Sequence, residues 1–203
     1  MTRASTDVLI DRIPVGRNLA TDAIWVIAFS LVTAICAQIS VHLPFVPVPI
    51  TGQTFSVLLS GAVLGWRRSF LSQVMYLAEG AAGFPVFADG GGSAVHLVGP
   101  SGGFLLCFPL AAALVGFLVE QGAGRSTWKL AGALVSADVL ILLAGSTWLC
   151  LLFRIPFTQA WRLGFYPFMI ADIAKVVLVG CTLPRVLRGY EARKDTPTQP
   201  RFS

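Results

Sequence analysis

Charged residues are scarce in this sequence. They make up 12% of its 203 residues, whereas hydrophobic residues make up 55%. A soluble domain carries about 25% charged residues, because its surface has to face water. The deficit excludes a soluble globular protein and predicts an integral membrane protein surrounded by a lipid bilayer. Spans of about 20 residues would nearly fill the chain, so a large soluble domain is excluded as well.

Cysteines with a short paired spacing are also missing. Each of the four cysteines lies inside an apolar run, and none has a second cysteine close by in the sequence. We interpret them as small buried hydrophobic side chains rather than as zinc ligands or a disulfide framework. They are Cys36, Cys107, Cys150 and Cys181.

The sequence contains no catalytic or nucleotide-binding pattern. His42 and His96 stand alone, so we expect neither a metal site nor a nucleophile–base pair. The glycine-rich stretch 90–103 lacks the Gly-Lys-Ser/Thr ending of a phosphate loop. The basic residues behind the net charge of +5 sit at segment ends rather than in patches with exposed aromatics, which argues against nucleic acid. We expect a non-enzymatic protein without metal or cofactor.

Apolar stretches are what the sequence has in abundance. The first, fifth and sixth are long enough to cross a bilayer, and the second and third reach across only if they are extended or tilted. We predict an all-α integral membrane protein, with a six-transmembrane-helix bundle at 19–188 between a polar N-terminal segment (1–18) and a polar tail (189–203). The first span is expected to be retained rather than cleaved as a signal. The six stretches are Ala20–Val41, Gln53–Gly65, Ser69–Gly83, Gly103–Val119, Leu130–Leu152 and Gly164–Leu187.

Arginine and lysine collect in alternate connections. The turns "GWRRSF" and "EQGAGRSTWK" and both tails carry basic residues, whereas the connections 42–52 and 85–102 carry none. The connection 153–163, with two arginines, is an exception. Because positive charge collects on the cytoplasmic side, we predict that both termini are cytoplasmic and that the protein is multi-pass in the cell membrane.

The two connections without basic residues are unusual for loops on the outer side. Pro44, Pro47 and Pro49 prevent a regular helix in the first, and the second is long and glycine-rich. Both are too apolar to lie comfortably in water. Irregular backbone at membrane depth is tolerated only where protein buries it or where it lines a cavity. The two loops therefore predict an enclosed pocket near the outer face.

Two charges interrupt the last apolar stretch, "GFYPFMIADIAKVVLVG". Asp172 and Lys175 are three residues apart, so they share one face of a helix. A charge at the bilayer centre costs roughly 2.5–3.5 kcal/mol on insertion scales, and the pair must face the protein interior. The pair is either a structural ion pair between helices or a binding site for a polar solute, and the residues alone leave both open.

Other polar residues in or near the spans have two possible roles. Asp138 lies deep in the fifth stretch and Glu79 near the outer end of the third, where either ligand contact or a bond between helices is expected. Thr51, Gln53 and Tyr76 lie near outer helix ends, where they either bond a ligand or cap a helix.

Small residues recur four apart in the first stretch, pairing Ser30 with Ala34 and Thr33 with Ala37. This spacing lets another helix approach closely. The neighbour is either a helix of the same bundle or a separate membrane protein.

Four segments then suggest a family. In order they are "AQISVHLPFVPVPITGQTFSVLLSGAVLG", "YLAEGAAGFPVFADGGG", "GPSGGFLLCFPLAAALVGFL" and "YPFMIADIAKVVLVG". Together they resemble BioY, the biotin-specific substrate-binding (S) component of energy-coupling factor (ECF) transporters, from about Ala20 to Leu187. The resemblance implies a biotin-uptake protein that captures the vitamin at a pocket near the outer face and releases it inward. An S component for another vitamin, a membrane enzyme and a structural membrane partner are the alternatives.

The resemblance also implies which residues bind biotin. Asp172 and Lys175 match the family's polar pair on the last helix; the first would accept from the ureido group and the second would donate to the ligand. Phe45, Phe87 or Tyr166 would lie against the apolar ring and tail. The remaining expected contacts are Gln53, Tyr76 and Asp89.

Partners follow from the same resemblance. It implies docking on an EcfT-like transmembrane coupling protein with two ATP-binding subunits, in agreement with the missing Walker motif. The family's small-residue surface on the first helix corresponds to Ser30, Ala34 and Ala37, which we predict to be the coupling surface.

Overall fold

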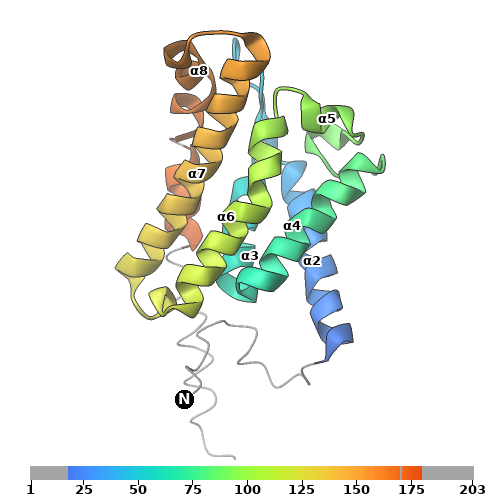
Figure 1. Cartoon of the computed structure of the whole chain (residues 1–203), viewed down its shortest axis with the longest axis vertical. Coiled ribbons are helices and arrows are strands. Elements are labelled where there is room, and N and C mark those ends of the chain that lie inside the picture. Colours follow the sequence, from blue (N-terminus) through green and yellow to red (C-terminus); the bar gives the residue numbers. More distant parts are fainter. Residues whose placement is uncertain (1–17, 170, 180–203) are drawn as a thin grey trace, which may run out of the picture.

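Long helices run side by side along the longest axis of the computed structural model, which describes residues 18–169 and 171–179 (Figure 1). The short elements α5 and α8 gather at one end, called the loop end below (Figure 1). Residues 171–179 are helical and are called the final helix. The elements in chain order are α2 (Leu19–Ala37), β1 (Ser40–Val41), β2 (Ile50–Thr51), α3 (Gln53–Leu64), α4 (Trp66–Ala81), η1 (Ala88–Gly90), α5 (Val95–Val98), α6 (Gly102–Glu120), η2 (Ala123–Arg125), α7 (Thr127–Phe153) and α8 (Phe157–Gly164).

Three helices are long and apolar enough to cross a membrane: α2, α6 and α7, with 19, 19 and 27 residues. The apolar helix α3 is shorter, with 12 residues, as the sequence predicts for the second stretch. The predicted tails fall mostly in 1–17 and 180–203, which lie outside the described residues. The architecture is thus largely helical and suited to a bilayer.

The loop after α2 corrects one prediction. The helix begins at the cap Asn18, whose side chain accepts from the Thr21 N–H at 2.8 Å, and it ends at Ala37 rather than at Val41. Strands β1 and β2 then pair in antiparallel register, so the described chain is not purely helical. The prolines between the strands exclude a helix and turn the chain back on itself, which lets the strands pair.

Helix α6 lies at the centre of the bundle and packs against α3, α4 and α7. Two glycines allow the closest approaches. A Cβ on Gly61 of α3 would lie 2.4 Å from the carbonyl oxygen of Ala112, and one on Gly116 of α6 would lie 2.4 Å from the amide nitrogen of Trp66. Only glycine fits at these crossings, and they hold α3, α4 and α6 together beneath the loop end.

Four buried polar residues link α2, α3 and α4, and we call them the helix-linking cluster: Thr33, Ser56, Ser60 and Gln73. The Gln73 amide donates to the hydroxyls of Thr33 at 3.2 Å and Ser60 at 3.3 Å. The hydroxyls of Thr33 and Ser56 lie 2.9 Å apart. Hydrogen bonds between helices of this kind stabilise a bundle inside lipid.

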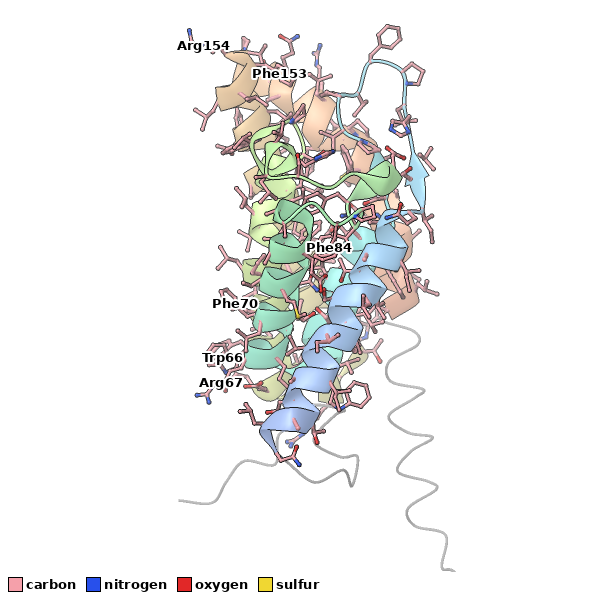
Figure 2. All side chains as sticks on the ribbon, turned by 90° about the vertical axis from the view of Figure 1, so that its right-hand side faces the viewer. Trp66, Arg67, Phe70, Phe84, Phe153 and Arg154 are labelled. Carbon is pink, nitrogen blue, oxygen red and sulfur yellow. The ribbon has the colours of Figure 1, made fainter. Side chains whose placement is uncertain are left out.

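Aromatic and basic side chains project near both ends of the molecule. Figure 2 shows Trp66 and Arg67 near one end and Phe153 and Arg154 near the other. The Arg67 guanidinium lies 5.1 Å from the centre of the Trp66 ring. Between the two ends, α2 exposes Ile24, Leu31 and Ile35 on its outer face. Aromatic and basic residues at two levels with an apolar band between them are typical of a membrane protein.

Candidate functional site

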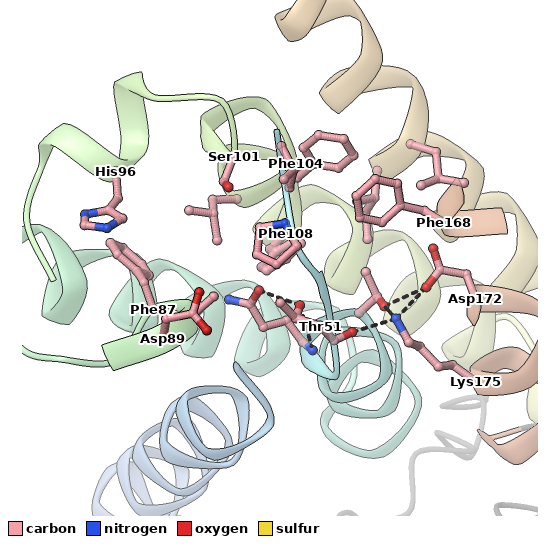
Figure 3. Close-up of a pocket in the computed structure, with 18 residues that line it drawn as sticks. Thr51, Phe87, Asp89, His96, Ser101, Phe104, Phe108, Phe168, Asp172 and Lys175 are labelled. Atoms are coloured by element: carbon pink, nitrogen blue, oxygen red, sulfur yellow. Dashed lines mark hydrogen bonds and ion pairs between the residues drawn. The ribbon is translucent and has the colours of Figure 1, made fainter. Parts of the chain in front are cut away.

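A cavity of about 150 Å³ opens near the loop end of the bundle. One wall is apolar and carries three phenylalanines, Phe104 and Phe108 of α6 and Phe168 (Figure 3). Ile141 and Leu142 of α7 complete this wall. The opposite wall comes from the two connecting loops. A largely apolar cavity with a few convergent polar groups is the usual form of a small-molecule site.

The polar groups at the base of the cavity form a second cluster, the pocket cluster: Thr51, Thr54, Asp172 and Lys175. The Lys175 ammonium donates to the carbonyl of Thr51 at 2.7 Å, to the hydroxyl of Thr54 at 2.7 Å and to Asp172 Oδ1 at 2.6 Å. The Thr54 hydroxyl in turn donates to Asp172 Oδ1 at 3.0 Å. An ammonium group has three N–H donors, so these bonds use all of them. The predicted pair thus exists, and α3 holds it in place.

Asp172 keeps one oxygen free. Its side chain is 1% exposed and lines the cavity, yet Oδ2 has no hydrogen-bond partner within the part of the chain that the structure describes. A buried carboxylate oxygen without a donor is costly, and the usual explanation is a ligand or water. Oδ2 is therefore the acceptor that a ligand N–H or O–H would meet. Lys175, in contrast, has no N–H left to donate to a ligand in this arrangement.

Gln53 lies at the surface of the cavity, and Tyr76 lies behind it in the core of the bundle. Gln53 lines the cavity; its Oε1 accepts from Thr51 at 2.7 Å and its Nε2 donates to the Tyr76 hydroxyl. Tyr76 does not line the cavity, since it is fully buried and donates to the carbonyl of Val86 at 3.0 Å. In this conformation Tyr76 contacts Gln53 and Phe87, both of which line the cavity, and its own ligand contact stays a prediction.

The loop wall contains Phe87, Asp89 and His96, which face the Asp172 side across the cavity (Figure 3). Phe87 is 2% exposed, and its ring contacts Tyr76 edge-on at 5.5 Å. Asp89 accepts from the Ser40 hydroxyl at 2.5 Å and pairs with His42 at 3.1 Å. The structure therefore brings Phe87 and Asp89 together at the cavity, as predicted, although both Asp89 oxygens are already bonded.

Two aromatic residues that were predicted to contact the ligand lie outside this cavity. Tyr166 is 54% exposed, lies outside the cavity and contacts the rings of Trp161 and Phe165. Phe45 is 96% exposed in the β1–β2 loop. Tyr166 stands two positions before Phe168, so it turns away from the face that carries Phe168 and Asp172.

Sequence reasoning missed the phenylalanines that do line the cavity. A helical spacing of four was the available signal: it joins Phe104 to Phe108 and Phe168 to Asp172, and residues four apart share a face. Thr54 was missed as well. It stands one residue after Gln53, and only the packing of α3 against the final helix brings it to Lys175.

The residues predicted to form the coupling surface lie largely inside the bundle. Ser30 and Ala37 are fully buried, and Ala34 is half-buried against the core. The Ser30 hydroxyl donates to Glu79 of α4. These small residues therefore let α2 approach its own bundle, because the same close spacing serves any neighbouring helix. Glu79 has a structural role here.

Asp138 remains a buried carboxyl of α7. It is 7% exposed, and its Oδ1 has no hydrogen-bond partner among the described residues. Ile141 and Leu142, three and four positions further on, line the cavity, so Asp138 lies one turn away on the same helix face. It does not itself line the cavity.

Known proteins resemble this chain in sequence and fold. A profile of the BioY family matches residues 5–192. A "Probable biotin transporter BioY" of Pyrococcus horikoshii is 41% identical over 147 residues, which cover 72% of this chain and 84% of that protein. "Biotin transporter BioY2" of Lactococcus lactis is 35% identical over 165 residues, which cover 78% and 88%. A crystal structure of the S-component for biotin from an ECF-type ABC transporter superposes with a TM-score of 0.78 and 21% identity, covering 85% of this chain and 95% of that one.

Proposed function

The chain belongs to the BioY family, and from this premise we propose that it is a high-affinity biotin-binding component of a vitamin-uptake system. It captures biotin from the outer side and releases it inward, and it is a transport protein rather than an enzyme. The observation that carries the proposal is Asp172 Oδ2, which has no hydrogen-bond partner among the described residues and lies at the base of a largely apolar cavity.

The polar and apolar groups of biotin are complementary to those that line this cavity. Its ureido ring carries N–H donors, and Asp172 Oδ2 is a charged acceptor that makes a strong bond with such a donor. Its thiophane ring and tail are apolar and suit the wall of Phe104, Phe108 and Phe168. With the ureido group at Asp172, the tail extends toward the loop end, where Ser101 and His96 also line the cavity. Lys175 acts indirectly, because it neutralises Asp172 and holds Oδ1 so that Oδ2 faces the ligand.

The membrane arrangement that we propose has six spans and both termini in the cytoplasm, in a cell membrane. Three long apolar helices support it, together with the aromatic and basic residues near both ends and the excess of Arg and Lys in alternate connections. The loop end is then the outer side, which agrees with a pocket that collects vitamin from outside.

Inward release requires partners. We propose an EcfT-like transmembrane coupling protein with ATP-binding subunits, because the sequence has no Walker motif and the fold matches an S-component. Ser30 and Ala37 are buried in this conformation, so of the three predicted coupling residues the half-buried Ala34 is the one that a partner helix can reach.

Ligand binding tests the function directly. We expect the purified protein in lipid nanodiscs to saturate with labelled biotin at one site, with a Kd below micromolar. Unlabelled biotin should compete, whereas thiamine and riboflavin should not. Absence of biotin binding at micromolar concentration would refute the proposal. Competition by another vitamin would instead indicate an S component of different specificity.

A further inference from the structure

The loop wall of the cavity is held by one side chain from the end of α2. The amide of Gln38, the residue after the helix, donates to the carbonyl of Phe87 at 3.1 Å and accepts from the N–H of Gly90 at 3.0 Å. It thereby bonds the main chain at both ends of the segment 87–90. A side-chain amide has a donor and an acceptor side by side, so it can replace a neighbouring strand for such a turn.

The same segment is joined a second time to the residues that follow α2. Asp89 adopts a left-handed conformation with φ of 58°. Its carboxylate accepts from the hydroxyl of Ser40 and pairs with His42. A left-handed conformation is uncommon for a residue other than glycine and persists where the surroundings hold it. The bonds from Ser40 and His42 are such a constraint.

This segment determines the shape of the cavity. Phe87 and Asp89 both line it. The Phe87 ring packs so closely on α4 that a Cβ on Gly80 would lie 2.1 Å from it. The bonds from Phe87 to Gly91 and from Gly91 to Ala88 are internal to the loop, so they fold it without fastening it to the bundle. Among the described residues, the main chain of 86–90 accepts or donates side-chain hydrogen bonds from Tyr76, which bonds Val86, and from Gln38, which bonds Phe87 and Gly90.

We propose that Gln38 is a positioning residue for the ligand site, which fastens the segment 87–90 to residues 38–42 so that the two loops open and close as one lid. The inference rests on the proposed function for its ligand. Ligand dissociation then requires both loops to move away from the cavity together. Loss of the two Gln38 bonds to the segment 87–90, which we call the clamp, therefore speeds dissociation more than association.

Substitution of Gln38 tests the kinetic part. Labelled biotin should dissociate about tenfold faster from Gln38→Ala, which removes both hydrogen bonds to the segment 87–90 as well as the bond to the carbonyl of Ala34, while the association rate changes less than about threefold. Gln38→Glu keeps the acceptor for the N–H of Gly90 but loses the donor to the carbonyl of Phe87, so biotin should dissociate from it at an intermediate rate. This variant serves as the test if Gln38→Ala does not fold. Gln121→Ala, exposed at the C-terminal end of α6, is the matched control and should behave as the unmodified protein. An unchanged dissociation rate in both Gln38 variants overturns the proposal.

A cross-link tests the lid without relying on biotin. In a background with the four native cysteines replaced by alanine, Ser40→Cys and Asp89→Cys should form a disulfide on oxidation, and Gln38→Ala should lower its yield severalfold. An equal yield in both backgrounds overturns the clamp. When the disulfide is formed after biotin has bound, the biotin should stay bound until a reductant is added. Release of biotin from the cross-linked protein at an unchanged rate overturns the proposal that the two loops form a lid. If the unmodified protein does not bind biotin but the yield of the cross-link still depends on Gln38, only the assignment of biotin as the ligand is refuted.

Discussion

Two polar clusters lie inside this apolar bundle, and they are satisfied to different extents. In the helix-linking cluster of Thr33, Ser56, Ser60 and Gln73, each side chain bonds another member or a backbone carbonyl, and no member lines the cavity. In the pocket cluster, Lys175 is fully bonded but Asp172 Oδ2 has no partner within the described residues, and it lines the cavity.

The difference separates a structural role from a binding role. A buried polar group that is fully paired stabilises the contact between helices, whereas an unpaired one lowers stability unless a ligand completes it. Mutations in the two clusters should therefore act on different quantities, namely the thermal midpoint in one and the Kd in the other.

The largest effect is expected from Asp172→Asn. The neutral amide weakens the bond to the ligand and leaves the partly buried Lys175 without its counter-charge. We therefore expect the Kd for biotin to rise roughly 10- to 100-fold or more, since each 1.4 kcal/mol corresponds to a factor of ten. Biotin titration of the purified variant measures this, with the yield of folded protein as the control. Normal affinity combined with poor folding would mean that the ion pair is only structural.

An intermediate effect, on stability alone, is expected from Gln73→Leu. The substitution removes the hydrogen bonds of Gln73 to its two partners on other helices, Thr33 and Ser60. Each such link is worth about 0.6 kcal/mol on average in membrane proteins, so the free energy of unfolding should fall by about 1 kcal/mol. The Kd for biotin should stay within about twofold. Thermal unfolding followed by fluorescence measures the first quantity, with the exposed Gln121→Leu as control. A tenfold weaker affinity would show that the two clusters act as one.

The smallest effect is expected from Asp138→Asn. Asp138 is buried one turn away from the cavity, has no ion pair among the described residues and does not line the site. The amide keeps its shape, so the substitution removes only a charge that interacts at longer range with Asp172 and Lys175. We expect a Kd within about threefold of the unmodified protein and a thermal midpoint that does not fall. A loss of affinity of tenfold or more would bring Asp138 into the binding site.

The site was only partly predictable, for a geometrical reason. Asp172 and Lys175 were found because charge is expensive in a span, whatever packs around it. The positions of Tyr76 and Tyr166 outside the cavity were not predictable, because a single residue near a helix end gives no information on which way it faces. The spacing of Ser30, Ala34 and Ala37 correctly indicates a close helix approach, but it cannot distinguish a helix of the same bundle from one of a partner.

The sequence by itself determined the membrane setting, the long helices, the two irregular loops and the charged pair, because each depends on composition or on spacing within one segment. Only the tertiary structure decided how the pair is used. Thr51 and Thr54 lie far from Lys175 in the chain, and their approach occupies two of its three N–H groups. The third bonds Asp172 Oδ1, which leaves Asp172 Oδ2 as an acceptor without a partner among the described residues. These contacts cannot be predicted from the sequence of either segment alone, because they arise from the packing of α3 against the final helix.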